Sequence, residues 1–363
     1  MKIALFINSL QGGGAERQMS EMAGLFAKHG HDVSMVTFND VPDDYKLHAG
    51  VKRVRLGEGK SRIARWLDIC RFFRRWDGAA IISFFPACTR MAVVFNLFHR
   101  RKYTLIAGER GSSDSIPIKT ERKQKRWIYK RVDYVVSNSI SQNKHLQEVF
   151  PEFKSKFVAI HNYMNLSSYP VTPLPASDVI RISILAHYRE QKNGERFARA
   201  IRKVKEQSDI TFVVEWYGRY QFSPTEYYKP YPVMKRYVEE HKLTDVLKLN
   251  DRSDDIRGII QNSDAVCMPS LYEGFCNAIS EGICCGRPAL ASRVADNPVM
   301  VHDGENGFLF DPTDESDICN ALLKFLSLSA TERQNMGDRS RQIAEDLFVE
   351  DSFVDSYLSL VKV

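Results

Sequence analysis

Two basic and two acidic residues of the second half of the chain have the spacing expected of a phosphate-binding site. Arg189 and Lys192 come just after an apolar run, residues 180–186, that is predicted to be a buried strand. Glu273 follows a second run of this kind, and Glu281 comes eight residues later. The carboxyl ends of parallel strands meet at one edge of a sheet, so we expect these four side chains to lie at one site.

The segment around Glu273 has the order strand, polar turn, helix. Gly274 lies in the turn, and a helix is predicted over residues 277–285, with Gly286-Arg287-Pro288 ending it. The first N–H groups of a helix favour an anion. A diphosphate there would also meet both cations, and Glu281, about two turns into the helix, would accept hydrogen bonds from the paired hydroxyls of a ribose.

The residues therefore predict a site for a nucleoside diphosphate. Each feature also has an ordinary structural explanation. Arg189 and Lys192 could form a surface ion pair, and Glu281 could stand on a solvated helix face. The prediction depends on their occurring together with the Gly274 turn.

Length and composition indicate an ordinary globular protein of two domains. A chain of 363 residues exceeds the size at which a single core usually keeps growing. No apolar run approaches the roughly 20 residues that span a bilayer, and the run at residues 3–7 is too short for a signal peptide. The seven cysteines show no metal-ligand spacing, so we expect reduced thiols, a cytoplasmic location and no bound metal.

The net charge of +6 is distributed unevenly. Residues 1–170 hold 28 Lys and Arg against 15 Asp and Glu, a balance of +13, and the remainder holds 23 against 30, a balance of −7. A basic first half predicts an anionic partner that the second half does not share.

The first half begins with a glycine-rich turn between two predicted strands, residues 2–8 and 33–38. This β-α-β pattern predicts a doubly wound parallel sheet. Arg17 occupies the third glycine position of the dinucleotide fingerprint, which disfavours a nicotinamide or flavin enzyme. Gly13 and Gly14 either let the backbone approach a ligand or form a tight turn only. Residues 57–61 resemble the end of a phosphate-binding P-loop, but Val54 stands at its first glycine position.

The segment from Arg62 to Trp76 is predicted to be an amphipathic helix with five arginines. It is either a core helix with a solvated basic face or a helix that lies on an anionic membrane, with basic residues at the headgroups. Two further basic clusters, from Arg100 to Lys102 and from Arg122 to Arg126, favour the membrane interpretation.

The second half repeats the alternation of strands and helices after a polar, Pro-rich segment, residues 164–178. We predict a first domain over 1–170, a second over 171–345, and a last helix within 346–363 that returns to the first domain. Two such domains imply a cleft with ligands at the carboxyl ends of both sheets.

The chain resembles the family 4 retaining glycosyltransferases of the GT-B fold, over almost its whole length. The resemblance rests on several motifs, of which the Glu-x7-Glu spacing with its flanks is the most specific: GGGAER (12–17), YKRVDYVVSNS (129–139), IHNY (160–163), RxxK (189–192), PSLYEGFCNAISEGICCGRPALAS (269–292) and DGENGFLF (303–310). It implies two Rossmann-like domains that face each other, with C-terminal helices that pack back.

The resemblance also implies roles for the site residues. Arg189 and Lys192 would neutralise the leaving diphosphate, Glu281 would hold the ribose, and Glu273 would approach the hydroxyls of the donor sugar. Gly13 and Gly14 would let the first domain's loop close over the donor. The backbone N–H groups of Phe275, Cys276 and Asn277 would contact the sugar or the diphosphate. The donor-binding set also includes Gly274, Arg219 and Arg252.

The sequence departs from many relatives at three places. Ala186-His187 stands where relatives have Gly-Arg, so Arg189 is expected to supply the guanidinium. Ser83-Phe84-Phe85-Pro86 stands where relatives carry a histidine, and Ala295-Asp296-Asn297 replaces a glycine-rich loop. We assign four residues to the acceptor side: Glu109, Arg110, Asn162 and Asp296.

By the resemblance, the chain transfers a sugar from a nucleotide diphosphate sugar, most simply UDP-linked, to a lipid-linked or polysaccharide-precursor acceptor at the inner face of the cytoplasmic membrane. The reaction would need no metal and no cofactor, and the acceptor hydroxyl would attack from the front face. The alternatives are an epimerase or hydrolase on the same fold and a catalytically silent binding subunit. Nucleic-acid binding is disfavoured because the basic half has no reader motif.

Overall fold

A computed structural model describes residues 1–11, 13–43, 45–59, 61–97, 103–110, 119–223 and 226–362. The chain folds into two compact units. Unit 1 comprises Met1–Tyr163 and Val349–Val363, and unit 2 comprises Met164–Phe348. Residues 164–170 and 346–348, which the sequence prediction placed outside the second domain, thus lie in unit 2. Gly12 and the basic cluster at 100–102 lie outside the described residues.

Unit 1 is built on a parallel sheet in the order β3-β2-β1-β4-β5-β6-β7. Its strands are β1 (Lys2–Phe6), β2 (Asp32–Thr37), β3 (Val51–Arg55), β4 (Ala80–Phe84), β5 (Thr104–Glu109), β6 (Tyr134–Ser137) and β7 (Phe157–Ala159). Along β1, Ile3 and Leu5 face one core while Ala4 and Phe6 face another. This alternation with both faces buried is what a sheet covered by helices on both sides requires.

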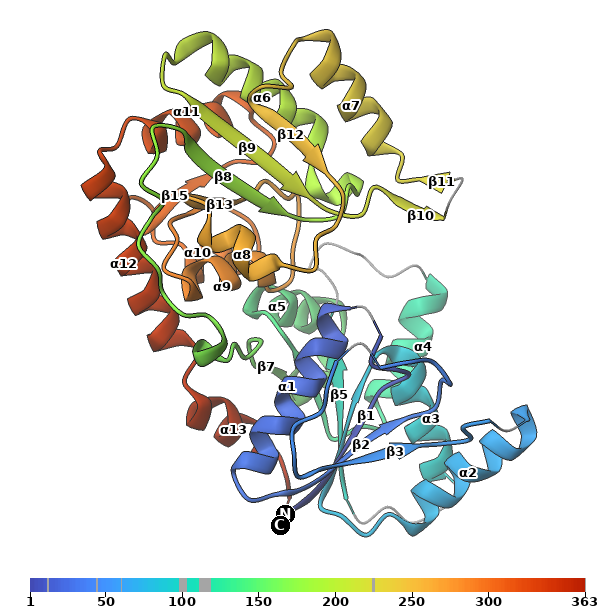
Figure 1. The fold of residues 1–363 in the computed structure, drawn as a ribbon. Coiled ribbons are helices and arrows are strands. Elements are labelled where there is room, and N and C mark those ends of the chain that lie inside the picture. The colour runs from blue at the N-terminus through green and yellow to red at the C-terminus, as the bar shows by residue number, and fades with distance from the viewer. Residues whose placement is uncertain are drawn as a thin grey trace. The chain divides into compact units, whose positions relative to one another are not determined.

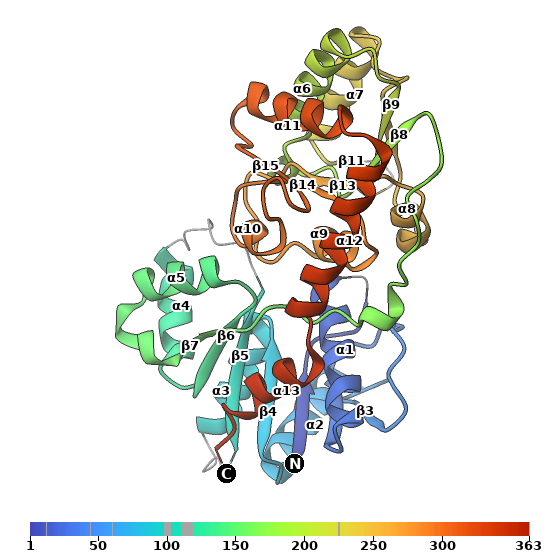
Figure 2. The same ribbon diagram turned by 90° about the vertical axis from the view of Figure 1, so that its left-hand side faces the viewer.

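Two helices pack on one face of this sheet, α1 (Gly14–Lys28) and α13 (Glu350–Leu358), which lie beside each other in Figure 2. The helices on the other face are α2 (Arg62–Arg75), α3 (Pro86–Leu97), α4 (Lys119–Tyr129) and α5 (Ile140–Val149). The last helix of the chain therefore belongs to the core of unit 1, where Val354 and Tyr357 are buried.

Unit 2 repeats the arrangement with a parallel sheet in the order β12-β9-β8-β13-β14-β15 (Figure 1). Its strands are β8 (Ile180–Leu185), β9 (Phe212–Tyr217), β12 (Leu247–Asn250), β13 (Ala265–Met268), β14 (Ala289–Ser292) and β15 (Gly307–Phe310). Both units therefore have the doubly wound, Rossmann-like topology that the sequence predicts.

The helices of unit 2 pack in two groups, one on each face of its sheet (Figure 1). One group contains α6 (Gly194–Gln207), α7 (Pro230–Glu240) and α11 (Glu315–Leu326). The other contains α8 (Ile256–Gln261), α9 (Asn277–Cys284), α10 (Asn297–Met300) and α12 (Ala330–Leu347). A small hairpin of β10 (Gln221–Ser223) and β11 (Glu226–Tyr227) precedes α7.

The polar, Pro-rich segment at residues 164–178 is attached to unit 2 by Arg287. This side chain is fully buried, and its guanidinium donates to the carbonyl oxygens of Thr172 (2.7 Å), Gln261 (2.8 Å) and Ile260 (3.1 Å). It also donates to the Thr172 hydroxyl at 2.6 Å. The segment contains one short 3₁₀ helix, η2 (Leu166–Ser168), and the buried charge of Arg287 fixes it to unit 2.

None of the helices in the described part of the chain is long and apolar enough to cross a bilayer. All seven cysteines are free thiols, and six of them are buried.

Candidate donor site

The topology of unit 2 selects one place on its sheet for a ligand. After β8, the strands β9 and β12 are added on one side of it in the sheet. The next strands, β13, β14 and β15, are added on the other side, beginning with β13 beside β8. In open α/β sheets ligands bind outside the carboxyl ends of the strands at such a switch point. The loops that follow β8 and β13 are the ones that carry Arg189, Lys192 and Glu273.

Backbone and side-chain hydrogen bonds join these two loops. The N–H of Leu271 donates to the carbonyl of Gln191 at 2.8 Å, and the side chain of Gln191 donates back to the carbonyl of Tyr272 at 2.8 Å. Asn193, in the left-handed conformation with φ 60°, donates to the carbonyl of Pro269 at 3.1 Å. The short turn η3 (Glu190–Lys192) is therefore held against the loop that contains Glu273.

Lys192 and Glu273 form the ion pair at the centre of this joined structure. Their side chains are only 17% and 10% exposed, and the Ser270 hydroxyl donates to the same Oε1 of Glu273 at 2.6 Å. Burial is the largest single influence on the pKa of Lys192 and acts to lower it, but Glu273 outweighs it, and the pKa lies above its ordinary value. Lys192 is consequently a fixed positive charge at neutral pH.

His187 lies among cations and is held neutral. Its pKa is lowered to about 4, first by burial and then by Arg189, Arg219, Lys192 and Arg252. The backbone N–H of Arg219 donates to its Nδ1 at 3.1 Å, which places the proton of the neutral ring on Nε2. The histidine thus offers one N–H donor and adds no charge.

Arg189 contacts Tyr228, a residue just before α7. Its guanidinium lies 5.4 Å from the centroid of the Tyr228 ring, and Nη2 donates to the hydroxyl at 3.4 Å. The ring of His187 lies nearly parallel to the same tyrosine, at 16° and 6.4 Å between centroids. Sequence reasoning missed Tyr228, because no spacing links it to the RxxK motif.

Replacing His187 by glutamine is expected to flatten the pH dependence of unit 2 stability. Between its folded pKa of about 4 and its ordinary 6.5, the unfolded chain binds more protons at this ring than the folded chain. Folding is therefore stabilised as pH rises through this window, and this contribution is lost as pH falls. Denaturant unfolding of both proteins across the window measures the difference. Parallel profiles would contradict the assignment of a buried neutral ring.

The second carboxylate, Glu281, lies on α9 and is 5% exposed. Gly282 beside it packs on β13, where an added Cβ would lie 2.2 Å from a methyl group of Val266. Only glycine therefore lets α9 approach the strand this closely. Cys276, at the N-cap of α9, has its pKa raised to about 12, chiefly by burial, so its thiol stays protonated.

The remaining donor-side residues surround this edge of unit 2. Phe275 is buried, with its ring 6.2 Å from that of Phe348, and Asn277 is the first residue of α9. Arg219 is exposed, and Arg252 forms an ion pair with Asp254 at 2.7 Å. One predicted acceptor residue also lies in unit 2: Asp296, 2% exposed, next to the N-terminus of α10.

The other predicted residues lie in unit 1, at the carboxyl edge of its sheet. Gly13 is the N-cap of α1, and Gly14 is the first residue of that helix. Arg110 and Asn162 lie together, because Nη1 of Arg110 donates to Oδ1 of Asn162 at 3.0 Å. Glu109 accepts hydrogen bonds from two residues of α4 instead, Lys125 at 3.0 Å and Tyr129 at 2.7 Å.

Asn138 is a further polar residue at this edge that sequence reasoning did not select. It follows β6 within the Ser137-Asn138-Ser139 motif, and its side chain is 6% exposed. Its Oδ1 has no hydrogen-bond partner among the residues that the structure describes, and neither has Nε of Arg110. A buried polar atom without a partner is costly, which favours a ligand or water here.

Comparison with known families agrees with this geometry. Residues 12–168 match the family described as "Glycosyltransferase Family 4", and residues 174–343 match "Glycosyl transferases group 1". Two glycosyltransferase family models thus match most of the chain between them, one over each half. The resemblance inferred from the Glu-x7-Glu motif is thereby confirmed.

Curated relatives match over shorter stretches. The UDP-Gal:alpha-D-GlcNAc-diphosphoundecaprenol alpha-1,3-galactosyltransferase of Escherichia coli is 30% identical over 137 residues, which cover 37% of this chain and 33% of the relative. The lipopolysaccharide core biosynthesis glycosyltransferase LpsE of Rhizobium meliloti is 26% identical over 127 residues, covering 33% and 37%. The matches thus span about a third of the length of these relatives.

Solved structures share the fold over the full length of the chain. HepE of Anabaena, in a complex with UDP, has a TM-score of 0.79 at 16% identity, covering 99% of this chain and 100% of that one. A glycosyltransferase of Rickettsia africae has a TM-score of 0.80 at 16% identity, covering 99% and 97%. These likenesses establish the GT-B fold.

Among the residues that the structure describes, no group of three or more His, Cys, Asp or Glu side chains could hold a metal ion.

Proposed function

We propose that this glycosyltransferase moves a sugar from a nucleotide diphosphate sugar, with UDP as the nucleotide, to a hydroxyl of a lipid-linked or polysaccharide-precursor acceptor. The observation that carries the proposal is the buried Lys192–Glu273 pair at the switch point of unit 2, next to the neutral His187. Two similarities support the choice of substrates. HepE was crystallised with UDP and with UDP-glucose, and the E. coli relative is named for transfer to a diphosphoundecaprenol-linked sugar.

The chemistry requires the bond between the sugar's anomeric carbon and the diphosphate oxygen to break. Negative charge then grows on the diphosphate, and positive charge grows on the sugar ring. Lys192 supplies a fixed charge, His187 supplies an Nε2–H donor, and the N-terminus of α9 supplies backbone N–H groups. Groups held in place before the reaction stabilise such charge without reorganising.

Glu273 has a positioning role in this mechanism in addition to any contact with the sugar. It accepts from both Lys192 and Ser270, so it fixes the lysine ammonium at the mouth of the site. Glu281, buried on α9, is proposed to hold the ribose hydroxyls. Arg189, Arg219 and Arg252 would add exposed positive charge around the diphosphate.

We further propose that transfer retains the configuration of the anomeric carbon. The acceptor hydroxyl would attack from the face that the diphosphate leaves, and the departing phosphate would take the hydroxyl proton. The cations around the diphosphate are proposed to serve as its counter-charge, so that neither a divalent metal nor a cofactor is needed. On the acceptor side, Arg110, Asn138 and Asn162 of unit 1 would hydrogen-bond acceptor hydroxyls, and Glu109 of unit 1 and Asp296 of unit 2 are also assigned to the acceptor.

The proposal predicts transfer that is insensitive to chelation. Purified protein is incubated with individual UDP-sugars and a bacterial lipid extract, with and without EDTA, and the product linkage is assigned by NMR. We expect an α-linked product from an α-linked donor at an unchanged rate in EDTA, because Lys192 and the arginines meet the diphosphate charge.

Two controls separate the alternatives. Turnover of the UDP-sugar without any acceptor would indicate an epimerase or a hydrolase. Binding of UDP-sugar without transfer to any extract would indicate a binding subunit, and loss of transfer in EDTA would contradict metal independence.

A further inference from the structure

Helix α2 of unit 1 has apolar side chains that remain substantially exposed after it packs on the core, although one of them, Trp66, also contacts the ring of core Phe95 at 5.1 Å between centroids. Ile69 and Phe73 are buried against the sheet, at 2% and 5% exposure, and attach the helix. Ile63, Trp66 and Leu67 belong to the same helix but are 75%, 49% and 49% exposed. Their i, i+3, i+4 spacing places them on neighbouring positions of the first turns of the helix. Packing within unit 1 leaves these side chains exposed.

The second half of α2 is basic. Arg71, Arg74 and Arg75 are exposed, and only Arg71 has an acidic partner in the same helix, Asp68 at 3.1 Å. Helix α2 therefore combines an exposed apolar turn with an exposed cluster of guanidinium groups, one after the other along its length.

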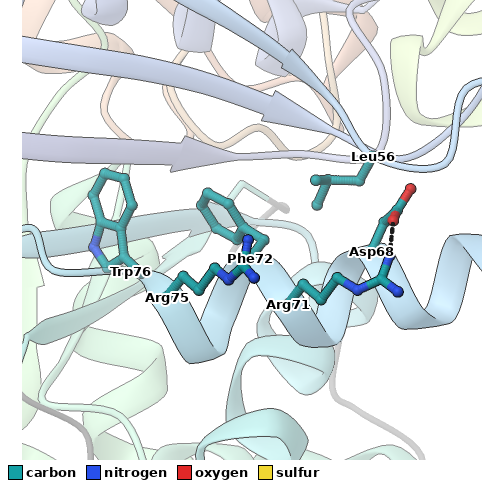
Figure 3. Close-up of a pocket in the computed structure, with 6 residues that line it drawn as sticks. All are labelled: Leu56, Asp68, Arg71, Phe72, Arg75 and Trp76. Atoms are coloured by element: carbon teal, nitrogen blue, oxygen red, sulfur yellow. Dashed lines mark hydrogen bonds and ion pairs between the residues drawn. The ribbon is translucent and has the colours of Figure 1, made fainter.

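A hollow of about 320 Å³ opens beside the basic half. Leu56, Phe72 and Trp76 line it with apolar surface, Arg71 and Arg75 extend along its rim, and Asp68 also lines it, paired with Arg71, as Figure 3 shows. An apolar floor beneath two arginines suits a group that has hydrocarbon at one end and an anion at the other.

Basic residues continue on α4, which packs on the same face of the sheet as α2. Arg122 and Lys123 are exposed there, and Arg126 is exposed beside Glu152, its partner at 2.6 Å. The apolar turn thus lies on a face of unit 1 with a surplus of positive charge.

We propose that this face of unit 1 binds an anionic lipid bilayer. Ile63, Trp66 and Leu67 would enter the headgroup region, Arg71, Arg74 and Arg75 would contact lipid phosphates, and the hollow would receive one lipid headgroup with the start of its chains. Such a partner matches both halves of the helix. A second copy of this chain matches them less well, because a two-fold contact would bring the arginine clusters together.

Binding to the bilayer would bring the enzyme to the lipid-linked acceptor of the proposed function. The binding itself is tested without assaying sugar transfer. Protein is sedimented with vesicles of phosphatidylglycerol and phosphatidylcholine, or of phosphatidylcholine alone. Ile63→Ser/Leu67→Ser and Arg74→Gln/Arg75→Gln are compared with the wild type. The matched controls change unit 2 instead: Val233→Ser, at a valine 49% exposed on α7, and Lys235→Gln/Arg236→Gln, which removes the same number of exposed charges.

We expect binding to anionic vesicles that falls about thirtyfold in the double arginine variant, since each basic residue near such a surface contributes about 1 kcal/mol. The apolar variant should lose about tenfold or more. Both controls should bind as the wild type does, and pure phosphatidylcholine should bind weakly. Brominated lipids should quench part of the tryptophan fluorescence, and that part should decrease in Trp66→Phe, with Trp76 at the hollow accounting for the remainder.

Three results would overturn the inference. The wild type could stay in the supernatant at low salt, or the α2 variants could bind as well as the wild type. The apolar variant could instead convert a dimer to a monomer in light scattering, which would assign the surface to a second copy. Transfer to a soluble acceptor in the α2 variants distinguishes these failures from failure of the proposed function, because none of the altered residues lies at the donor site.

Discussion

Replacing Lys192 by alanine is expected to reduce kcat/KM for sugar transfer by about 30-fold to 5,000-fold, which corresponds to 2–5 kcal/mol. The change removes the fixed charge that is proposed to meet the diphosphate and leaves Glu273 buried without its ammonium partner. If Lys192 stabilises charge that develops during the reaction, kcat should fall more than the affinity for UDP-sugar. Steady-state kinetics and calorimetric titration with UDP-sugar measure the two quantities separately.

Two further variants make this result interpretable. Lys248→Ala removes a lysine from β12 of the same sheet, where its contact with Glu215 is 3.8 Å and its side chain is 48% exposed, and it should leave kcat/KM nearly unchanged. The double variant Lys192→Ala/Glu273→Ala removes the unpaired carboxylate and should recover stability without recovering transfer. Near-normal transfer by Lys192→Ala would refute the role assigned to Lys192.

Replacing Arg287 by leucine is expected to lower the free energy of unfolding of unit 2 by about 3 kcal/mol or more. Three backbone carbonyls, those of Thr172, Ile260 and Gln261, would lose a charged donor inside the protein. Each buried acceptor without a partner costs about 1–3 kcal/mol. Denaturant unfolding followed by hydrogen exchange in unit 2 measures the loss.

Arg293→Leu is the matched control, since this arginine is 54% exposed and contacts Asp303 at 3.4 Å. It should change the free energy of unfolding by less than about 0.5 kcal/mol. Equal stabilities of Arg287→Leu and the wild type would show that the hydrogen bonds of Arg287 do not hold residues 172–173 against unit 2.

Much of the fold was predictable because the local patterns are strong. Buried parallel strands are short apolar runs, and glycines and prolines end them, so the strands predicted at residues 2–8, 33–38 and 180–186 agree with β1, β2 and β8 to within two residues. The nearness of Lys192 and Glu273 was also predictable, because each follows a strand of one parallel sheet. Their direct ion pair required knowing that β8 and β13 are neighbours.

The surroundings of the cations could not be predicted from the sequence, because they depend on contacts between segments that are far apart in the chain. Arg189 was expected to replace the missing arginine at position 187, but its orientation is set by Tyr228. The lowered pKa of His187 depends first on burial and then on four cations, two of which follow other strands. The buried hydrogen bonds of Arg287 could not be predicted from the Gly-Arg-Pro motif. The glycine and the proline of this motif end a helix, but the motif says nothing of where the arginine side chain lies.

Hydrogen exchange of the full chain with and without UDP tests the location of the donor site most directly. The site described here predicts slower exchange in residues 186–194 and 269–281, the loops joined by Gln191 and Leu271, and little change in α2. Slower exchange confined to other segments, or none at saturating UDP, would contradict a nucleotide site at the switch point of unit 2.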